Sequence, residues 1–307
     1  MKIIFMGNSE IACPILNTVE KSKHKILSVV SNSPKALGRG LSRRLTPVGK
    51  LANDLNLKFL SADSLRNSEL IDTIKILQAD IFVVVAFRIL PSSFLSLSKM
   101  GAMNLHASLL PKYRGAAPIQ HALLNGDTQT GISTFLIDKD LDTGPILLQK
   151  EVPILPQDNF NTLSGKISNE GSSLILESLG LLEKNNHKLT PQLDKDVSYA
   201  PKILKKEMLI DWNQSASQIN NKVRALSYTG AFTFINGKRM KLYKTKVHEN
   251  SKPSKPGKVL IIDKKRVSIS CANDDLELIE VQMENKARML TSEWIKGARI
   301  KTGDILG

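Results

Sequence analysis

The sequence has 307 residues, of which 41% are hydrophobic and 23% charged, which predicts a soluble globular protein of two domains rather than one. Its two cysteines, Cys13 and Cys271, lie far apart without a C-x-x-C partner, which excludes a disulfide scaffold and a cysteine-based zinc site. The formal net charge is +14, and residues 201–307 alone hold 21 Lys and Arg against 11 Asp and Glu. A clustered basic excess of this kind favours a nucleic acid as partner over a membrane surface.

The first half of the chain alternates short β-rich runs with segments of helical periodicity. The opening run KIIFM is too short for a signal peptide, and no later run reaches the length of a membrane span, so we expect a cytoplasmic protein. Residues 80–87 are apolar on both faces, which is typical of a central strand in a parallel sheet covered by helices. The alternation therefore predicts a doubly wound α/β domain. The expected strands are 2–6, 25–31, 80–87, 102–107, 133–138 and 145–154, and the expected helices are 13–23, 46–56, 67–78 and 160–184.

The sequence changes in character after residue 184. Residues 185–206 are polar and interrupted by prolines, and residues 215–226 have apolar residues at helical spacing. Further on, FTFINGKRMKLYKTKV contains an Asn-Gly step flanked by alternating residues, a strong hairpin signal, and the strand-like runs KVLIID, RVSISCA and LELIEVQM follow. Such a series of short strands predicts a small barrel of the oligonucleotide-binding (OB) type. We therefore predict an α/β domain at 1–184, a linker at 185–206 and a β-barrel domain at 207–307.

Three polar residues form a candidate catalytic set. Asn104 and His106 are separated by one residue near the carboxyl end of an expected strand, so both side chains leave the same face of the sheet. Open α/β sheets bind ligands at this edge, and the turn SLLP that follows offers backbone donors there. Asp142, which precedes Thr-Gly-Pro, lies in a tight turn that could return its carboxylate toward the histidine. In such a set the amide bonds a developing oxyanion, the imidazole relays a proton and the carboxylate orients the imidazole.

The spacing of these residues leaves a second interpretation open, since a histidine on a strand is often structural and an Asp before Thr-Gly often forms a turn.

Several other kinds of chemistry are excluded because the sequence lacks the motifs that they require. The turn GNSEIA is not G-x-G-x-x-G, which argues against a nicotinamide cofactor, and no P-loop sequence occurs. Neither H-E-x-x-H nor G-x-S-x-G is present, so we expect no metal site and no serine-hydrolase chemistry.

The stretch NLHASLLPKYRGAAPIQHALLNGDTQTGIS, together with DLDTGPIL, closely resembles the formyltransferase family that uses 10-formyltetrahydrofolate. The resemblance runs from KIIFMG to GARIKTGDILG, which is essentially the whole chain. It implies a Rossmann-like formyltransferase domain with a parallel-sheet core, a C-terminal OB-like β-barrel domain, and 10-formyltetrahydrofolate as formyl donor without a metal. The family's catalytic positions match Asn104, His106 and Asp142, and its tetrahydrofolate-binding positions match Ser108, Leu109, Leu110 and Pro111.

Further features resemble the family members that act on a transfer RNA. These are GRG at 38–40, YAPKILKKE followed by IDW at 199–212, and the basic β-domain; the segment between Glu20 and Asp54 also holds eight Lys and Arg and no acid. The resemblance implies transfer of a formyl group to the α-amino group of methionine on initiator methionyl-tRNA, for translation initiation. We expect a monomer without membrane contact. The expected tRNA-binding residues are Arg39, Arg43, Lys202, Lys205 and Lys206.

Two positions depart from the family pattern, because Arg88 and Asp140 stand where glycine is frequent, Arg88 close to the expected folate pocket. Two other functions are also compatible with parts of the sequence. A formyl-folate-dependent transferase or hydrolase acting on a small amine would share the Asn104 and His106 chemistry without needing the basic domain. A noncatalytic tRNA-binding protein would account for the charge but not for the polar set. The uneven charge favours the tRNA substrate over both.

Overall fold

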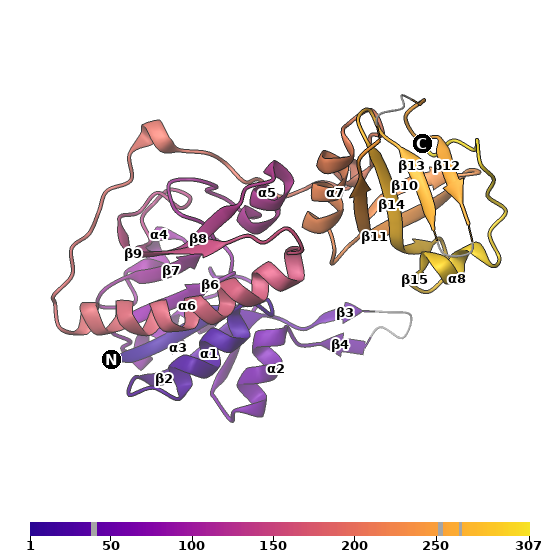
Figure 1. Cartoon of the computed structure of the whole chain (residues 1–307). Coiled ribbons are helices and arrows are strands. Elements are labelled where there is room, and N and C mark those ends of the chain that lie inside the picture. Colours follow the sequence, from indigo (N-terminus) through magenta and orange to yellow (C-terminus); the bar gives the residue numbers. More distant parts are fainter. Residues whose placement is uncertain (38–41, 251–253, 264–265) are drawn as a thin grey trace. The chain divides into compact units, whose positions relative to one another are not determined.

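The computed structural model describes residues 1–37, 42–250, 254–263 and 266–307, which form two compact units (Figure 1). Two short stretches that precede residue 164 in the sequence belong to the second unit. The sequence-based domain limits at residues 184 and 206 stay a prediction. The N-terminal unit comprises Met1–Ala116, Gln129–Pro153 and Ser164–Ala200, and the C-terminal unit comprises Ala117–Thr128, Ile154–Leu163 and Pro201–Gly307.

The N-terminal unit is built on a seven-stranded sheet in the order β5-β2-β1-β6-β7-β8-β9. The first five strands in this order are parallel, β8 runs antiparallel to them, and β9, which is antiparallel to β8, runs in their direction again. The chain adds β2 and β5 on one side of β1 and then returns to β6 on the other side, so the topological switch falls between β1 and β6. This arrangement confirms the predicted Rossmann-like domain with a parallel core. The strands are β1 Lys2–Gly7, β2 Lys25–Asn32, β5 Phe59–Ala62, β6 Ile81–Val85, β7 Ala102–His106, β8 Gln129–Leu136 and β9 Ile146–Pro153.

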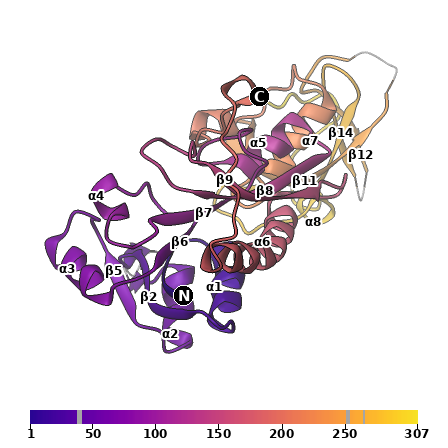
Figure 2. The same ribbon diagram turned by 90° about the vertical axis from the view of Figure 1, so that its left-hand side faces the viewer.

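Helices cover both faces of this sheet. On one face Phe82 of β6 packs with Ile74 of α3 and Phe94 of α4. On the other face Gly171 of α6 lies against Leu105 of β7, and Figure 2 shows α6 beside α1. Because both faces are covered, all five residues of β6 are buried, which explains the uninterrupted apolar run in the sequence. The helices are α1 Ala12–Glu20, α2 Pro47–Asp54, α3 Ser68–Leu77, α4 Ser92–Leu95 and α6 Phe160–Glu183.

The C-terminal unit contains an antiparallel sheet in the order β10-β11-β14-β13-β12, with β15 paired to β14. The predicted hairpin joins β10 to β11 through Asn236 and Gly237, whose φ angles of 50° and 71° suit a tight hairpin turn. Gly307 N donates to Phe234 O in the edge strand β10 (3.0 Å), and Val259 N in the other edge strand, β12, donates to Asp304 O (2.8 Å). The last residues thus close the sheet into the predicted OB-like barrel. The strands are β10 Ala231–Ile235, β11 Lys238–His248, β12 Val259–Ile262, β13 Val267–Ser270, β14 Asp275–Met283 and β15 Met289–Leu290.

The barrel core is filled from the sheet and from α7 (Ala216–Ala225). Trp212, Ile219 and Leu242 are buried together, and the indole of Trp212 donates to Thr233 Oγ1 (3.0 Å), so its polar atom is satisfied. Cys271 belongs to the same core. Burial raises the pKa of its thiol to about 12, so this residue acts as a small hydrophobic side chain rather than as a nucleophile.

Several elements are absent from the sequence-based expectations because their sequence signals are weak. They include the edge strand β5, the short helix α4 and the short strand β15, described above. The others are the hairpin of β3 and β4, the helix α5 in the C-terminal unit, the short helix α8, and two 3₁₀ turns, η1 inside the predicted linker and η2 across its end. Their bounds are β3 Lys35–Leu37, β4 Ser42–Arg44, α5 Pro118–Asn125, α8 Thr291–Ile295, η1 Asp194–Asp196 and η2 Lys205–Met208.

Candidate active site

The site is carried by the end of β7, which lies between β6 and β8 in the sheet. Leu105 packs against α6, so Asn104 and His106, which flank it on the strand, are directed to the opposite face of the sheet. Asn104 is half-buried and His106 is only 6% exposed. The strand therefore presents an amide and an imidazole side by side at the carboxyl edge of the sheet, where open α/β folds bind ligands.

The imidazole of His106 has a defined partner at each ring nitrogen. Its Nε2 lies 2.8 Å from Tyr113 O, and its Nδ1 lies 3.7 Å from Asp142 Oδ2. A carbonyl oxygen only accepts hydrogen bonds, so the Nε2 contact requires the proton on Nε2. In the neutral ring the lone pair of Nδ1 then faces the Asp142 carboxylate. This arrangement suits a group that takes up a proton at Nδ1 and is stabilised as a cation by the carboxylate.

The turn between β8 and β9 places Asp142 beside the histidine. Asp142 adopts a left-handed φ of 54°, and its Oδ2 accepts a hydrogen bond from Gly115 N (2.8 Å). Gly144 is required two residues later, because a Cβ at this position would lie 1.8 Å from Leu136 O. The structure thus brings together the three residues that the sequence singled out, with Asn104 and His106 on one strand and Asp142 on a separate turn.

The predicted tetrahydrofolate-binding residues 108–111 form a turn with its own internal bonds. Ser108 is buried and its Oγ donates to Lys112 O (2.5 Å), while Leu110 is buried against Phe135. Leu109 and Pro111 are half-buried. The sequence suggested that this turn offers backbone donors to a ligand, but the N–H of Leu110 within it donates to Ser133 Oγ (2.9 Å).

Ser133 and Gln149 support this turn from β8 and β9. The Ser133 hydroxyl accepts from Leu110 N and from Gln149 Nε2 (2.8 Å) and donates to Ser108 O (2.7 Å), which uses its full hydrogen-bonding capacity. Gln149 Nε2 also donates to Leu110 O (2.9 Å). Sequence reasoning missed both residues, since no pattern near them in the sequence points to partners on another strand.

Arg88, one of the two departures from the family pattern, is turned toward the ends of β2 and β5. Its guanidinium donates to Asn32 Oδ1, to Ala62 O and to Asp63 O, the last at 2.8 Å. Burial lowers the pKa of this arginine below its ordinary value. The guanidinium is therefore engaged with neighbouring strand ends. Asp140, the second position that differs from the family pattern, is exposed, and its backbone N–H donates to Asp138 Oδ1 (3.2 Å).

The candidate tRNA-binding residues lie on exposed segments. Arg43 is exposed on β4, Lys202 is exposed in an extended segment, and Lys205 and Lys206 are exposed in η2. Arg39 lies outside the described residues.

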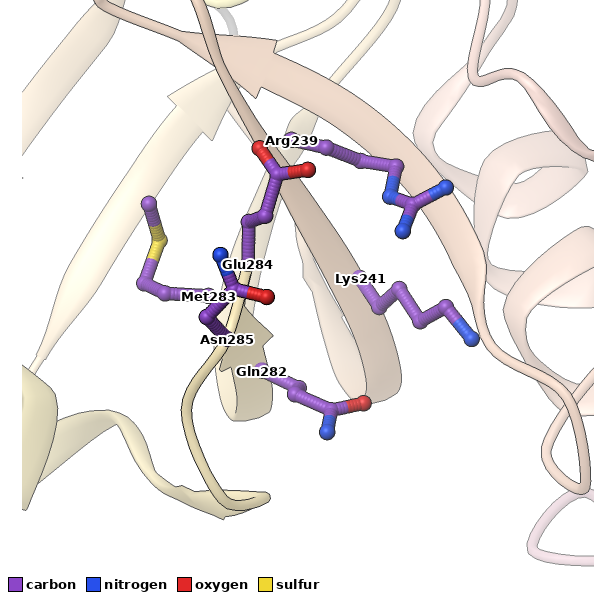
Figure 3. Close-up of a pocket in the computed structure, with 6 residues that line it drawn as sticks. All are labelled: Arg239, Lys241, Gln282, Met283, Glu284 and Asn285. Carbon is purple, nitrogen blue, oxygen red and sulfur yellow. The ribbon is translucent and has the colours of Figure 1, made fainter. Parts of the chain in front are cut away.

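A separate shallow pocket of about 150 Å³ lies in the C-terminal unit, between β11 and the end of β14 (Figure 3). Its wall combines two cations with two amides and one carboxylate, and Lys241 Nζ also donates to Thr229 O (2.8 Å). It is lined by Arg239, Lys241, Gln282, Met283, Glu284 and Asn285.

The described parts of the chain show neither a metal-binding cluster nor a membrane-spanning helix. Within them, no group of three or more His, Cys, Asp or Glu residues is arranged to hold a metal ion. No helix in the described ranges has the length and apolar character needed to span a membrane.

Comparison with known proteins gives consistent results over the whole chain. Residues 1–179 match the formyl transferase family and residues 202–299 match the formyl transferase C-terminal domain. A methionyl-tRNA formyltransferase of Clostridioides difficile is 40% identical over 309 residues, covering 100% of both chains. One of Syntrophus aciditrophicus is 38% identical, covering 100% of this chain and 99% of the relative. Among solved structures, the sugar 3N-formyl transferase WlaRD superposes with a TM-score of 0.67 at 22% identity, over 94% of this chain and 99% of its own.

Proposed function

Because the chain belongs to the formyl transferase family, and its full-length relatives are methionyl-tRNA formyltransferases, we infer that it formylates methionyl-tRNA. The formyl donor is 10-formyltetrahydrofolate and the acceptor is the α-amino group of the methionine esterified to the tRNA. The enzyme requires no metal for this reaction. We propose that the enzyme acts on the initiator methionyl-tRNA, whose formylated form is used in translation initiation.

In this reaction the α-amino nitrogen attacks the formyl carbon held on N10 of the folate. A new N–C bond forms, the carbonyl oxygen becomes an oxyanion, and the C–N10 bond then breaks. The amine loses one proton, and N10 gains one as it leaves. A protein site for this chemistry needs a donor for the oxyanion and a group that moves a proton, but no covalent nucleophile.

Asn104, His106 and Asp142 fit these needs. The Asn104 amide is proposed to donate to the oxyanion, because it lies on the same face of β7 as His106 and carries no charge. His106 is proposed to take the amine proton at Nδ1, since its Nε2 is bonded to Tyr113 O, and to deliver a proton to N10. Asp142 Oδ2, 3.7 Å from Nδ1, would stabilise the imidazolium that forms.

The remaining residue assignments belong to the same proposal. The 108–111 turn, with Leu109 and Pro111 half-buried, is proposed to bind the tetrahydrofolate. Residues 207–307 are proposed as the tRNA-binding domain, residues 1–184 as the catalytic domain, and the enzyme as a cytoplasmic monomer. The residues proposed to contact the tRNA are Arg39, Arg43, Lys202, Lys205 and Lys206.

The pairing of His106 with Asp142 beside Asn104 carries the proposal, because it brings a proton-transfer pair and an oxyanion donor to one strand end. The test is transfer of radiolabelled formyl from 10-formyltetrahydrofolate to purified methionyl-tRNA, initiator against elongator. We expect strong labelling of the initiator and weak labelling of the elongator. Formylation of a small amine, or release of formate alone, would assign the site to a different formyl-folate reaction. Binding of tRNA without transfer would make the chain a tRNA-binding protein.

A further inference from the structure

Residues 190–200, called the strap from here on, run beside the segment that follows β7. Arg114 N donates to Ser198 O (2.9 Å) and Ala200 N donates to Arg114 O (2.8 Å), so the two segments pair like short parallel strands. Tyr113 N donates to the hydroxyl of Ser198 (2.9 Å). The strap therefore fixes the backbone at Tyr113, whose carbonyl oxygen is the partner of His106 Nε2.

The strap also holds the turn that carries Asp142. Thr190 and Ile146 exchange two backbone hydrogen bonds of 2.8 Å at the start of β9. The side-chain amide of Gln192 donates to Asp142 O (2.9 Å) and to Gly144 O (2.8 Å). The side chain of Gln192 thus binds the backbone carbonyls of both Asp142 and Gly144.

Gln192 connects the two turns to each other. Its Oε1 accepts a hydrogen bond from Arg114 Nε (3.0 Å), and Arg114 is only 6% exposed. The Gln192 side chain therefore donates both N–H groups to the turn that carries Asp142, while its oxygen accepts from Arg114, next to Tyr113. An unpaired buried donor or acceptor is costly, so each of these contacts depends on the others.

Both turns contain a non-glycine residue in the left-handed region, Tyr113 with φ 61° and Asp142 with φ 54°. Such conformations are unfavourable for residues with a side chain and persist only where neighbouring contacts hold them. These same two residues face the two ring nitrogens of His106. The position of the imidazole relative to the carboxylate therefore depends on how the two turns are held together.

We propose that Gln192 is a positioning residue of the transfer site, which sets the distance between His106 and Asp142 by joining their two turns through Arg114. The expected effect on the rate of formyl transfer rests on the proposed function. The effect of Gln192 on the distance between His106 and Asp142 does not. Gln192 touches no reacting atom in this scheme, so its effect reaches the reaction only through the pair that it positions.

The test is Gln192→Glu, which keeps an oxygen acceptor for Arg114 but removes both N–H donors and places a carboxylate against two carbonyl oxygens. We expect kcat to fall roughly ten- to a hundredfold, since small displacements of reacting groups have effects of this size. The KM values for the folate and for the tRNA should change little, because uniform substrate binding is not altered. The ring proton signals of His106 in the NMR spectrum should shift at constant pH.

Gln157→Glu makes the same chemical change at an exposed glutamine and is the matched control, with kcat, KM and His106 signals as in the parent protein. The proposal is overturned if Gln192→Glu lowers only the melting temperature, or raises KM for tRNA with kcat unchanged. It is also overturned if the His106 signals do not move. If the parent protein fails to formylate methionyl-tRNA, the proposed function is wrong, and the NMR comparison still decides the role of Gln192.

Discussion

At the scale of single residues, Asn104 and His106 have different consequences for the reaction although they share a strand face. His106 has a partner at each ring nitrogen, so the orientation of its ring and the position of the Nε2 proton are set before substrate binds. Asn104 is half-buried on the same face of the strand. In the proposed mechanism its amide donates to the oxyanion, so its contribution is expected to be specific to the transition state.

Replacing Asn104 by alanine is therefore expected to lower kcat on the order of a hundredfold, because one oxyanion donor is removed. KM for either substrate should change far less, since the missing bond forms only in the transition state. Steady-state formylation of initiator methionyl-tRNA measures both quantities. Asn186→Ala, at an exposed position, is the control and should leave them unchanged. An Asn104→Ala enzyme altered only in KM would rule out the oxyanion role.

At the scale of elements, the start of α2 joins a local helix signal to the strand ends of the N-terminal unit. Thr46 precedes Pro47, and its Oγ1 accepts a hydrogen bond from Gly49 N (2.9 Å), as expected for a helix N-cap. The same oxygen lies 2.5 Å from Ser31 Oγ at the end of β2. The chain between these two residues carries Arg39 and Arg43, so this contact closes the base of the segment proposed to meet the tRNA.

Thr46→Ala removes both bonds and should lower the free energy of unfolding by about 1–2 kcal/mol, the usual cost of losing an N-cap. The measurement is urea denaturation, in which the midpoint should fall while the slope m stays constant. Thr73→Ala is the matched control. The Thr73 hydroxyl only donates back to Glu69 O within α3 (2.8 Å), so its removal should cost less than about 0.5 kcal/mol. Equal destabilisation by the two variants would contradict the capping role.

The elements with strong local patterns were predictable from the sequence. The apolar run of β6 and the Asn236-Gly237 hairpin are examples, because burial on both faces and positive φ angles each leave a direct trace in residue type. The reversed direction of β8 leaves no such trace, since the alternation of residues along a strand is the same in both directions. The packing of α5 with the C-terminal unit is also absent from its local sequence, because it depends on α7, about a hundred residues later.

The candidate site divides in the same way. Asn104, His106 and Asp142 could be singled out because a two-residue spacing on a strand places two side chains on one face and a tight turn can return a third toward them. The spacing left a structural interpretation open, and the family resemblance favoured the catalytic one. Gln192 and Ser198 could not, because both act on backbone groups of segments far away in the sequence. When a polar residue binds backbone groups far away in the sequence, the residues next to it show no pattern that indicates this. The segment that contains Gln192 and Ser198 was therefore interpreted as a linker.

At the scale of the whole molecule, the charge of +14 is the feature that the transfer chemistry does not explain. A small-molecule formyl transfer needs an oxyanion donor and a proton shuttle, and neither requires a basic surface. A tRNA substrate does, since binding of its phosphates releases bound cations and makes affinity fall with salt. The exposed pair Lys205 and Lys206 lies near the start of the C-terminal unit's main segment, in η2, and offers two cations for this purpose.

The KM for methionyl-tRNA should therefore rise steeply with salt concentration, while the KM for 10-formyltetrahydrofolate stays nearly constant. In the variant Lys205→Ala with Lys206→Ala, the logarithmic salt dependence of the tRNA KM should flatten by about one unit for each phosphate that the variant no longer binds. The turnover number should stay at the parent value, because neither lysine belongs to the transfer site. Lys75→Ala, which removes an exposed lysine from α3, is the control and should leave the slope unchanged. If the double variant keeps the parent slope, these lysines do not bind phosphates, and the basic excess of the C-terminal unit must act through other residues.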